Sequence, residues 1–276
     1  MSTTDPATAT VAVARYVGSG GASAEDAVVV EEPLEIRVSG DTIAVTMRTP
    51  GHERDLALGF LFAEGLVQAA DDVASVAFCG RPGDESLRNT LEVTPRAGGW
   101  LERAPRDPAR RGTVTTAACG VCGRVQIDDL LERLPVLAPS DAVPIGVVTG
   151  AVRALRGEQT LFAQTGGCHG AGLFRFDGAH VATREDVGRH NAVDKLVGAM
   201  LAAGAVPLAS HILVVSGRAS FEIVQKAACA GVPVVACVSA PSSLAVTLAE
   251  RAGVTLVGFV RGDRCNVYTH ASRITD

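Results

Sequence analysis

The 276-residue chain is long enough for one large domain or two modest ones with an ample core. Hydrophobic residues make up 47% of it and charged residues 20%, a balance typical of a compact soluble protein. Its 25 basic and 30 acidic side chains give a formal net charge of −5, which disfavours general binding to nucleic acid or to a membrane surface.

Targeting and redox signals are weak. No apolar run reaches the ~18 residues that a membrane-spanning helix needs, and the first ten residues lack the basic-then-apolar order of a secretory signal. The seven cysteines are odd in number and scattered, unlike a disulfide framework. We therefore expect a cytoplasmic protein with reduced thiols, no nucleic-acid partner and no membrane partner.

The first third of the chain predicts a small α+β domain. Residues 1–26 are rich in Ala, Thr, Gly and Ser, and we expect a partly ordered tail there. Residues 35–47 alternate around a turn at 39–41, which is typical of a hairpin. A helix with Gly65 as its C-cap and two short strands follow, at 54–66, 73–79 and 88–93. We take 27–125 as this domain, ending in a mobile loop.

The second half has a different rhythm, in which strands and helices alternate. The expected strands are 172–176, 180–184, 211–216, 234–238 and 255–260, and the expected helices are 127–134, 147–156, 187–203, 220–230 and 242–251. The apolar runs at 212–215 and 234–238 are typical of a parallel sheet covered on both faces. Residues 126–276 therefore predict a three-layer α/β sandwich.

Cys119 and Cys122 form a CxxC pair with a glycine after each cysteine. A structural zinc site usually needs four ligands, and the only other close grouping is Cys168 with His169. Thioredoxin-like redox motifs usually open a helix after a strand. The small polar residues before the pair suggest a mobile loop instead, which suits a carrier of persulfide sulfur. Two incidental cysteines are the remaining alternative.

Two further clusters are open to more than one interpretation. Residues 165–172 hold four glycines beside Cys168 and His169, which fits a ligand wall or tight packing about equally. Residues 184–195 hold seven ionisable side chains ahead of an apolar helix. A helix N-terminus attracts anions, so His190 and Asn191 are expected beside bound phosphate or substrate. A solvated helix start with ion pairs is the alternative.

Three predicted strands end in segments that carry Ser, Gly and Arg, at 216–220, 239–243 and 259–264. In open α/β sheets, ligands bind beyond the carboxyl ends of the strands. None of the three segments is a P-loop or a GxGxxG motif, so each alone is weak evidence. Their common location predicts a pocket for an anionic nucleotide or phosphate.

These segments resemble the FdhD/NarQ family of formate dehydrogenase accessory sulfurtransferases, from about residue 31 to 270. The resemblance rests on the segments 58–65, 119–123, 165–169, 184–195, 216–222 and 261–264. It implies a cytoplasmic homodimer that takes sulfur from a cysteine desulfurase. The acceptor it implies is the bis-molybdopterin guanine dinucleotide form of the molybdenum cofactor, before insertion into formate dehydrogenase. It also implies a cytidine-deaminase-like fold for the larger domain.

The resemblance assigns roles to individual residues. Cys119 matches the persulfide-bearing cysteine and Cys122 its partner. The family usually has serines directly before the first cysteine, where this chain has Ala117 and Ala118, so any hydrogen bond from those hydroxyls is missing. The stretch implicated in cofactor binding matches Phe259, Val260, Arg261, Gly262, Asp263 and Arg264.

We add His190, Ser216, Arg218 and Ser239 to the expected cofactor-binding residues. A guanine nucleotide is expected to fit the same pocket, and no protein-bound zinc is expected. A zinc-dependent deaminase needs H-x-E with P-C-x-x-C, and the chain has neither. A non-catalytic chaperone that shelters the cofactor without using its cysteines remains the alternative function.

Overall fold

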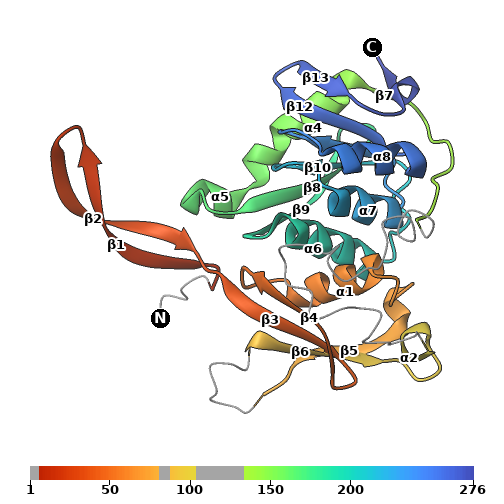
Figure 1. The fold of residues 1–276 in the computed structure, drawn as a ribbon, viewed down its shortest axis with the longest axis horizontal. Coiled ribbons are helices and arrows are strands. Elements are labelled where there is room, and N and C mark those ends of the chain that lie inside the picture. The colour runs from red at the N-terminus through yellow and green to blue at the C-terminus, as the bar shows by residue number, and fades with distance from the viewer. Residues whose placement is uncertain (1–5, 81–87, 104–133) are drawn as a thin grey trace.

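The computed structural model describes residues 6–80, 88–103 and 134–276. Within them, a four-stranded sheet and a six-stranded sheet lie on opposite sides of a pair of helices, and a two-stranded hairpin reaches away from the rest (Figure 1). The helix expected at 127–134 falls almost wholly outside the described residues.

The hairpin replaces the expected N-terminal tail. Strands β1 (Thr8–Val17) and β2 (Gly20–Val29) pair antiparallel over their whole length. Gly18, at a φ of 60°, makes the turn in a conformation that glycine adopts without strain. The valines of β1 alternate with other residues, and such β-branched side chains favour a strand. The expectation of a tail followed the Ala- and Gly-rich composition of the segment instead.

The four-stranded sheet has the order β4-β3-β6-β5. Its strands are β3 (Glu32–Val38), β4 (Asp41–Arg48), β5 (Val73–Phe78) and β6 (Thr90–Pro95). Alternate residues of β3 (Leu34, Ile36 and Val38) are buried in a core shared with helix α1 (Glu53–Ala63). The expected hairpin at 35–47 is confirmed. A four-residue helix, α2 (Trp100–Arg103), follows this sheet.

The six-stranded sheet has the order β13-β12-β11-β10-β8-β9. Its strands are β8 (His169–Arg175), β9 (His180–Asp186), β10 (His211–Val215), β11 (Val234–Cys237), β12 (Thr255–Arg261) and β13 (Arg264–Val267). The central strands β10, β11 and β12 are parallel, as expected, and the outer pairings are antiparallel. The short strands β7 (Val143–Pro144) and β14 (Ile274–Thr275) pair beside it.

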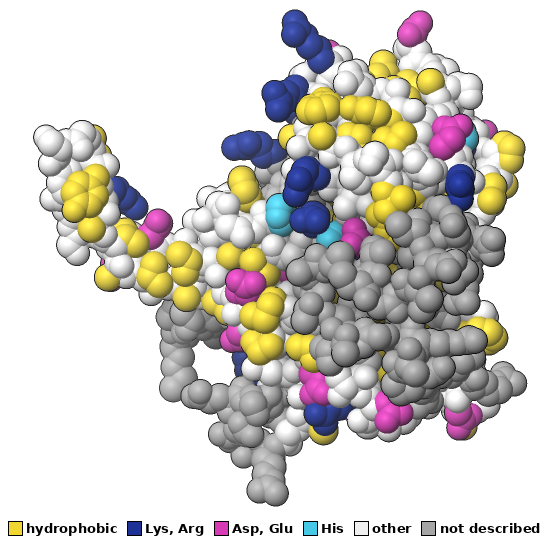
Figure 2. All heavy atoms as spheres, viewed as in Figure 1, with side chains coloured by type: hydrophobic (Ala, Val, Ile, Leu, Met, Phe, Trp, Pro, Cys, Tyr) yellow, Lys and Arg dark blue, Asp and Glu magenta, His cyan; other side chains and the backbone are white. Residues whose placement is uncertain are grey.

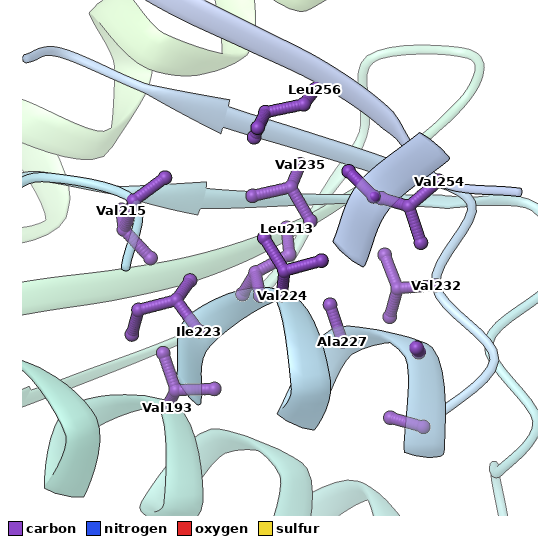
Figure 3. Close-up of a cluster of buried hydrophobic side chains, with 14 of the residues drawn as sticks. Val193, Leu213, Val215, Ile223, Val224, Ala227, Val232, Val235, Val254 and Leu256 are labelled. Atoms are coloured by element: carbon purple, nitrogen blue, oxygen red, sulfur yellow. The ribbon is translucent and has the colours of Figure 1, made fainter. Parts of the chain in front are cut away.

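Helices cover both faces of this sheet. They are α4 (Ile145–Glu158), α5 (Thr160–Thr165), α6 (Arg189–Ala202), α7 (Phe221–Cys229) and α8 (Ser243–Ala252). In β10, Ile212 and Val214 pack towards α4, while Leu213 and Val215 pack towards α6, α7 and α8. Figure 3 shows the second of these clusters, where Leu213 and Val215 meet side chains such as Val193 and Val224. Each such burial contributes about 1.5–3 kcal/mol.

The two sheets are joined through the close crossing of α1 and α6. A side chain on Gly59 of α1 would overlap the backbone carbonyl of Asp194, and one on Gly198 of α6 would overlap that of Asp55. Two glycines therefore bring the helix backbones into direct contact. This crossing fixes the start of α6 against the loop between β4 and α1.

Candidate functional site

The three predicted strand ends meet at one cavity of about 780 Å³, which we call the strand-end cavity. Ser216 follows β10, Val238 follows β11, and Val260 with Gly262 belongs to β12 and its turn; all four line it. Helices α4 and α5 form the opposite wall. The volume lies within the range of small-molecule sites in proteins.

The rim of the strand-end cavity is basic. Arg153 and Arg156, one turn apart on α4, line it and are exposed. Arg153 reaches across to Asp263 in the β12–β13 turn, with 3.0 Å between Nη2 and Oδ1. Arginine side chains gather along the edge of the molecule where α4, β12 and β13 lie (Figures 1 and 2), since both lysines of the chain are buried. An anion is the ligand that this rim favours.

The glycine-rich segment forms part of the cavity wall, as one of its two interpretations requires. Gly166, Gly167, Cys168 and His169 all line the cavity. The backbone N–H of the next residue, Gly170, donates to the Ser216 hydroxyl at 2.9 Å and ties this wall to the end of β10.

Glu185 organises the same wall from β9. Its carboxylate accepts the backbone N–H groups of Leu161 and Phe162, both at 2.8 Å, and thereby caps α5. The Cys168 thiol donates to Glu185 at 3.3 Å. Burial, reinforced by the Glu185 charge, raises the pKa of Cys168 to about 12. Cys168 is therefore a protonated thiol near neutral pH and a poor nucleophile.

Burial together with the nearby Arg189 lowers the pKa of His169. A neutral imidazole at this wall can donate one hydrogen bond and accept another without adding charge to the rim.

The stretch expected to bind cofactor is split by the structure. Val260 and Gly262 line the strand-end cavity. Arg261 and Arg264 are opposite each other in the backbone register of β12 and β13, and both are exposed. Phe259 has a positive φ of 53° and is 41% exposed. The other expected residues near this edge, which do not line the cavity, are Asp263, Arg218 and Ser239.

His190 lies in a different place from the one expected. It lines a second, smaller cavity of about 70 Å³ between α1, β4, α6 and α7, which we call the His190 cavity. Its Nε2 lies 3.0 Å from the Ser220 hydroxyl and 3.4 Å from the Glu222 carboxylate. The hydrogen bond from His190 lowers the pKa of Glu222 to about 2.

Several residues of the charged cluster at 184–195 connect the six-stranded sheet and α6 to the end of β4 and the residue after it. The buried Asp186 carboxylate lies 2.7 Å from Lys195 Nζ and accepts hydrogen bonds from Thr49 N and Asn191 Nδ2. Lys195 also donates to the Thr49 carbonyl, and Asn191 to the Met47 carbonyl. The Asn191 amide therefore joins the two sheets, while the residue also lines the His190 cavity. That Asn191 lies beside a ligand stays a prediction.

Comparison with known proteins shows the family of this chain. The model of the FdhD/NarQ family matches residues 29–275. The chain belongs to the FdhD/NarQ family. "Sulfur carrier protein FdhD" of Anaeromyxobacter dehalogenans (strain 2CP-C) is 55% identical over 94% of this chain and 92% of that protein. The protein of the same name from Mycobacterium tuberculosis is 49% identical over 89% of this chain and 91% of its own length.

A solved structure of the same kind supports the fold. A putative formate dehydrogenase accessory protein from Desulfotalea psychrophila matches with a TM-score of 0.75 and 26% identity, over 98% of this chain and all of that one. The mixed α/β architecture of this FdhD/NarQ chain is therefore shared with a known structure.

Cys119 and Cys122, the cysteines that the FdhD/NarQ resemblance singles out, lie outside the described residues, as do Ala117 and Ala118. Within the described part of the chain, no group of three or more His, Cys, Asp or Glu is placed to hold a metal ion. The helices described there include none long and apolar enough to cross a membrane.

Sequence reasoning missed the α4–α5 wall of the strand-end cavity. Arg153 and Arg156 have helical spacing within the predicted helix 147–156, so their common face was available as a signal. Gln159 and Phe162 gave no signal. They line the cavity because the chain breaks between α4 and α5, and no residue pattern marked that break.

Proposed function

We propose that this chain is a sulfur carrier and sulfurtransferase in formate dehydrogenase maturation. It takes persulfide sulfur from a cysteine desulfurase on Cys119 and delivers it to the molybdenum cofactor, as bis-molybdopterin guanine dinucleotide, before the cofactor enters formate dehydrogenase. The observation that carries the proposal is the strand-end cavity with its basic rim, in a chain of this family.

The first step needs only thiol chemistry. The Cys119 thiolate attacks the terminal sulfur of the donor persulfide, the donor S–S bond breaks, and the donor cysteine leaves as a thiolate. Cys119 then carries the persulfide, and no outside oxidant or reductant is consumed.

Cys122 supplies the electrons for release. Its thiolate attacks the inner sulfur of the Cys119 persulfide, forming a Cys119–Cys122 disulfide and freeing sulfide to the acceptor. A cellular thiol then reduces the disulfide. This scheme gives each of the two cysteines a distinct task.

The cofactor is the substrate, and the strand-end cavity is where its nucleotide end would bind. Arg153 and Arg156 would meet the phosphates, with Val260 and Gly262 on the opposite wall. A guanine nucleotide alone would fit the same place. The exposed Arg218, Arg261 and Arg264 would extend the positive surface beyond the cavity.

Further parts of the proposal rest on the sequence and on the resemblance. From the resemblance we infer a homodimer and a cytidine-deaminase-like fold for the larger domain. From the residues and the resemblance together we infer a cytoplasmic location and no protein-bound zinc. The domain boundary expected near residue 125 stays a prediction.

Complementation tests the proposal against a purely cofactor-sheltering chaperone. Cells lacking their own family member would receive wild type, Cys119→Ser, Cys122→Ser or Cys79→Ser, a change at an exposed cysteine outside the cavity, and formate dehydrogenase activity would be assayed. The proposal expects wild type and Cys79→Ser to restore activity and Cys119→Ser to fail at equal protein levels. Activity restored by a Cys119→Ser, Cys122→Ser double variant would favour the chaperone instead.

A further inference from the structure

Gln159 is a buried polar residue in the wall of the strand-end cavity. It occupies the break between α4 and α5 and is 5% exposed. Its side-chain Nε2 is buried and has no hydrogen-bond partner among the residues that the structure describes. A buried amide left unpaired is unfavourable, so such a group calls for a specific explanation.

The other buried polar side chains of this wall are satisfied by the protein. The Thr149 hydroxyl donates to the Gly146 carbonyl at 3.3 Å, and the Cys168 thiol donates to Glu185 at 3.3 Å. Gln159 therefore differs from its neighbours, because its amide still has hydrogen-bonding capacity to offer to a bound molecule.

The surrounding structure sets the position of this amide. Glu185 caps α5 immediately after Gln159, which fixes the break between the two helices. On the other side lies Gly170, where a Cβ would come within 2.6 Å of Gln159 Nε2. The absence of a side chain at Gly170 makes room for the amide in the cavity wall.

The lining changes in character from the buried part of the cavity to its rim. Leu155 and Phe162 lie on either side of Gln159 in the sequence and line the same cavity, so its wall carries an aliphatic and an aromatic side chain besides the amide. Arg153 and Arg156 lie at the exposed part. This order suits a molecule with a flat base at one end and phosphates at the other.

We propose that Gln159 reads the base of the bound nucleotide. This inference rests on the proposed function, in which the nucleotide end of the cofactor occupies the strand-end cavity. Guanine presents the N1–H donor beside the O6 acceptor, and a carboxamide offers the complementary acceptor and donor. Gln159 holds the guanine edge while Arg153 and Arg156 hold the phosphates.

Binding measurements with GDP and pyrophosphate separate the two ends. Calorimetry would compare wild type with Gln159→Met, which keeps side-chain length and removes the amide, and with Gln164→Met, an exposed change on α5 outside the cavity. We expect Gln159→Met to weaken GDP binding at least about tenfold. Pyrophosphate binding should stay within about twofold of wild type, because the amide does not contact phosphate.

Gln159→Asn, which keeps the amide but withdraws it by one methylene, provides a second variant with the same expectation if Gln159→Met does not fold. Undiminished GDP binding by folded Gln159→Met or Gln159→Asn overturns the role of Gln159 and leaves the proposed function standing. A wild-type protein that binds neither GDP nor pyrophosphate contradicts the proposed nucleotide site itself, and the role of Gln159 with it.

Discussion

Cys168 lines the strand-end cavity, yet its environment suppresses the chemistry of its thiol. Burial and the Glu185 charge raise the pKa of Cys168 to about 12, so its thiol stays protonated at pH 8. We predict that iodoacetamide alkylates the exposed Cys79 much faster than Cys168. Peptide mass spectrometry over time measures both rates. Comparable rates would show that the Cys168 thiol is not held in its protonated form.

Glu222 predicts a pH-dependent part of the stability. The hydrogen bond from His190 lowers its pKa to about 2, from the ordinary glutamate value of 4.5. The stabilisation is therefore complete above about pH 4.5 and is lost as the pH falls towards 2. We predict that Glu222→Gln lowers the free energy of unfolding at pH 7 by on the order of 2 kcal/mol.

Urea unfolding at several pH values between 7 and 3 measures this effect. The wild type should lose stability through the acidic range more steeply than Glu222→Gln, because the variant has no carboxylate to protonate. Parallel pH profiles for the two proteins would contradict the assigned role of the Glu222–His190 pair.

Alanine is expected to have opposite effects on stability at a glycine in the crossing of α1 and α6 and at a glycine outside it. Gly198→Ala would place a methyl group against the Asp55 carbonyl and force the helices apart, costing about 1–3 kcal/mol or more. Gly150→Ala, inside α4, meets open space and should stabilise by about 0.5–1 kcal/mol. Thermal unfolding of both variants measures the contrast. A Gly198→Ala protein as stable as wild type would mean that the helices do not cross this closely.

At the level of elements, the sequence predicted the strands and helices whose apolar residues recur at regular spacing. The alternation of β10, α7, β11, α8 and β12 follows from buried β-branched runs and helical spacing, and each was predicted within a few residues. Strand β13 was missed because Arg264 to Val267 has few apolar residues and pairs only at the sheet edge. The hairpin β1–β2 was missed because composition was given more weight than alternation.

The candidate site was predictable only in part. The segments 216–220 and 259–264 reach one cavity because the parallel arrangement of β10, β11 and β12 brings their carboxyl ends together. The segment 239–243 contributes no lining residue, and the cavity meets that strand end at Val238 instead. His190 and Asn191 line the separate His190 cavity because the start of α6 also meets the four-stranded sheet, and no local pattern showed that contact. The α4–α5 wall depends on tertiary packing across the sheet.

For the whole molecule, the buried Asp186–Lys195 pair joins the six-stranded sheet and α6 to Thr49, which follows β4 of the four-stranded sheet. Lys195→Met would leave a buried carboxylate without its counter-charge, and we predict a loss of about 3–5 kcal/mol in unfolding free energy. An Asp186→Asn, Lys195→Met double variant should recover part of that loss. Urea unfolding of the single and double variants measures it. Additive losses in the double variant would contradict the pairing.

Sulfur carriage by Cys119 is tested most directly by intact-protein mass spectrometry after incubation with a cysteine desulfurase and cysteine. We expect wild type and Cys168→Ser to gain one sulfur atom, about 32 Da, that a thiol reductant removes. Cys119→Ser should gain none. A wild-type protein that gains no sulfur, or a Cys119→Ser protein that gains as much as wild type, would contradict the proposal that Cys119 carries the persulfide.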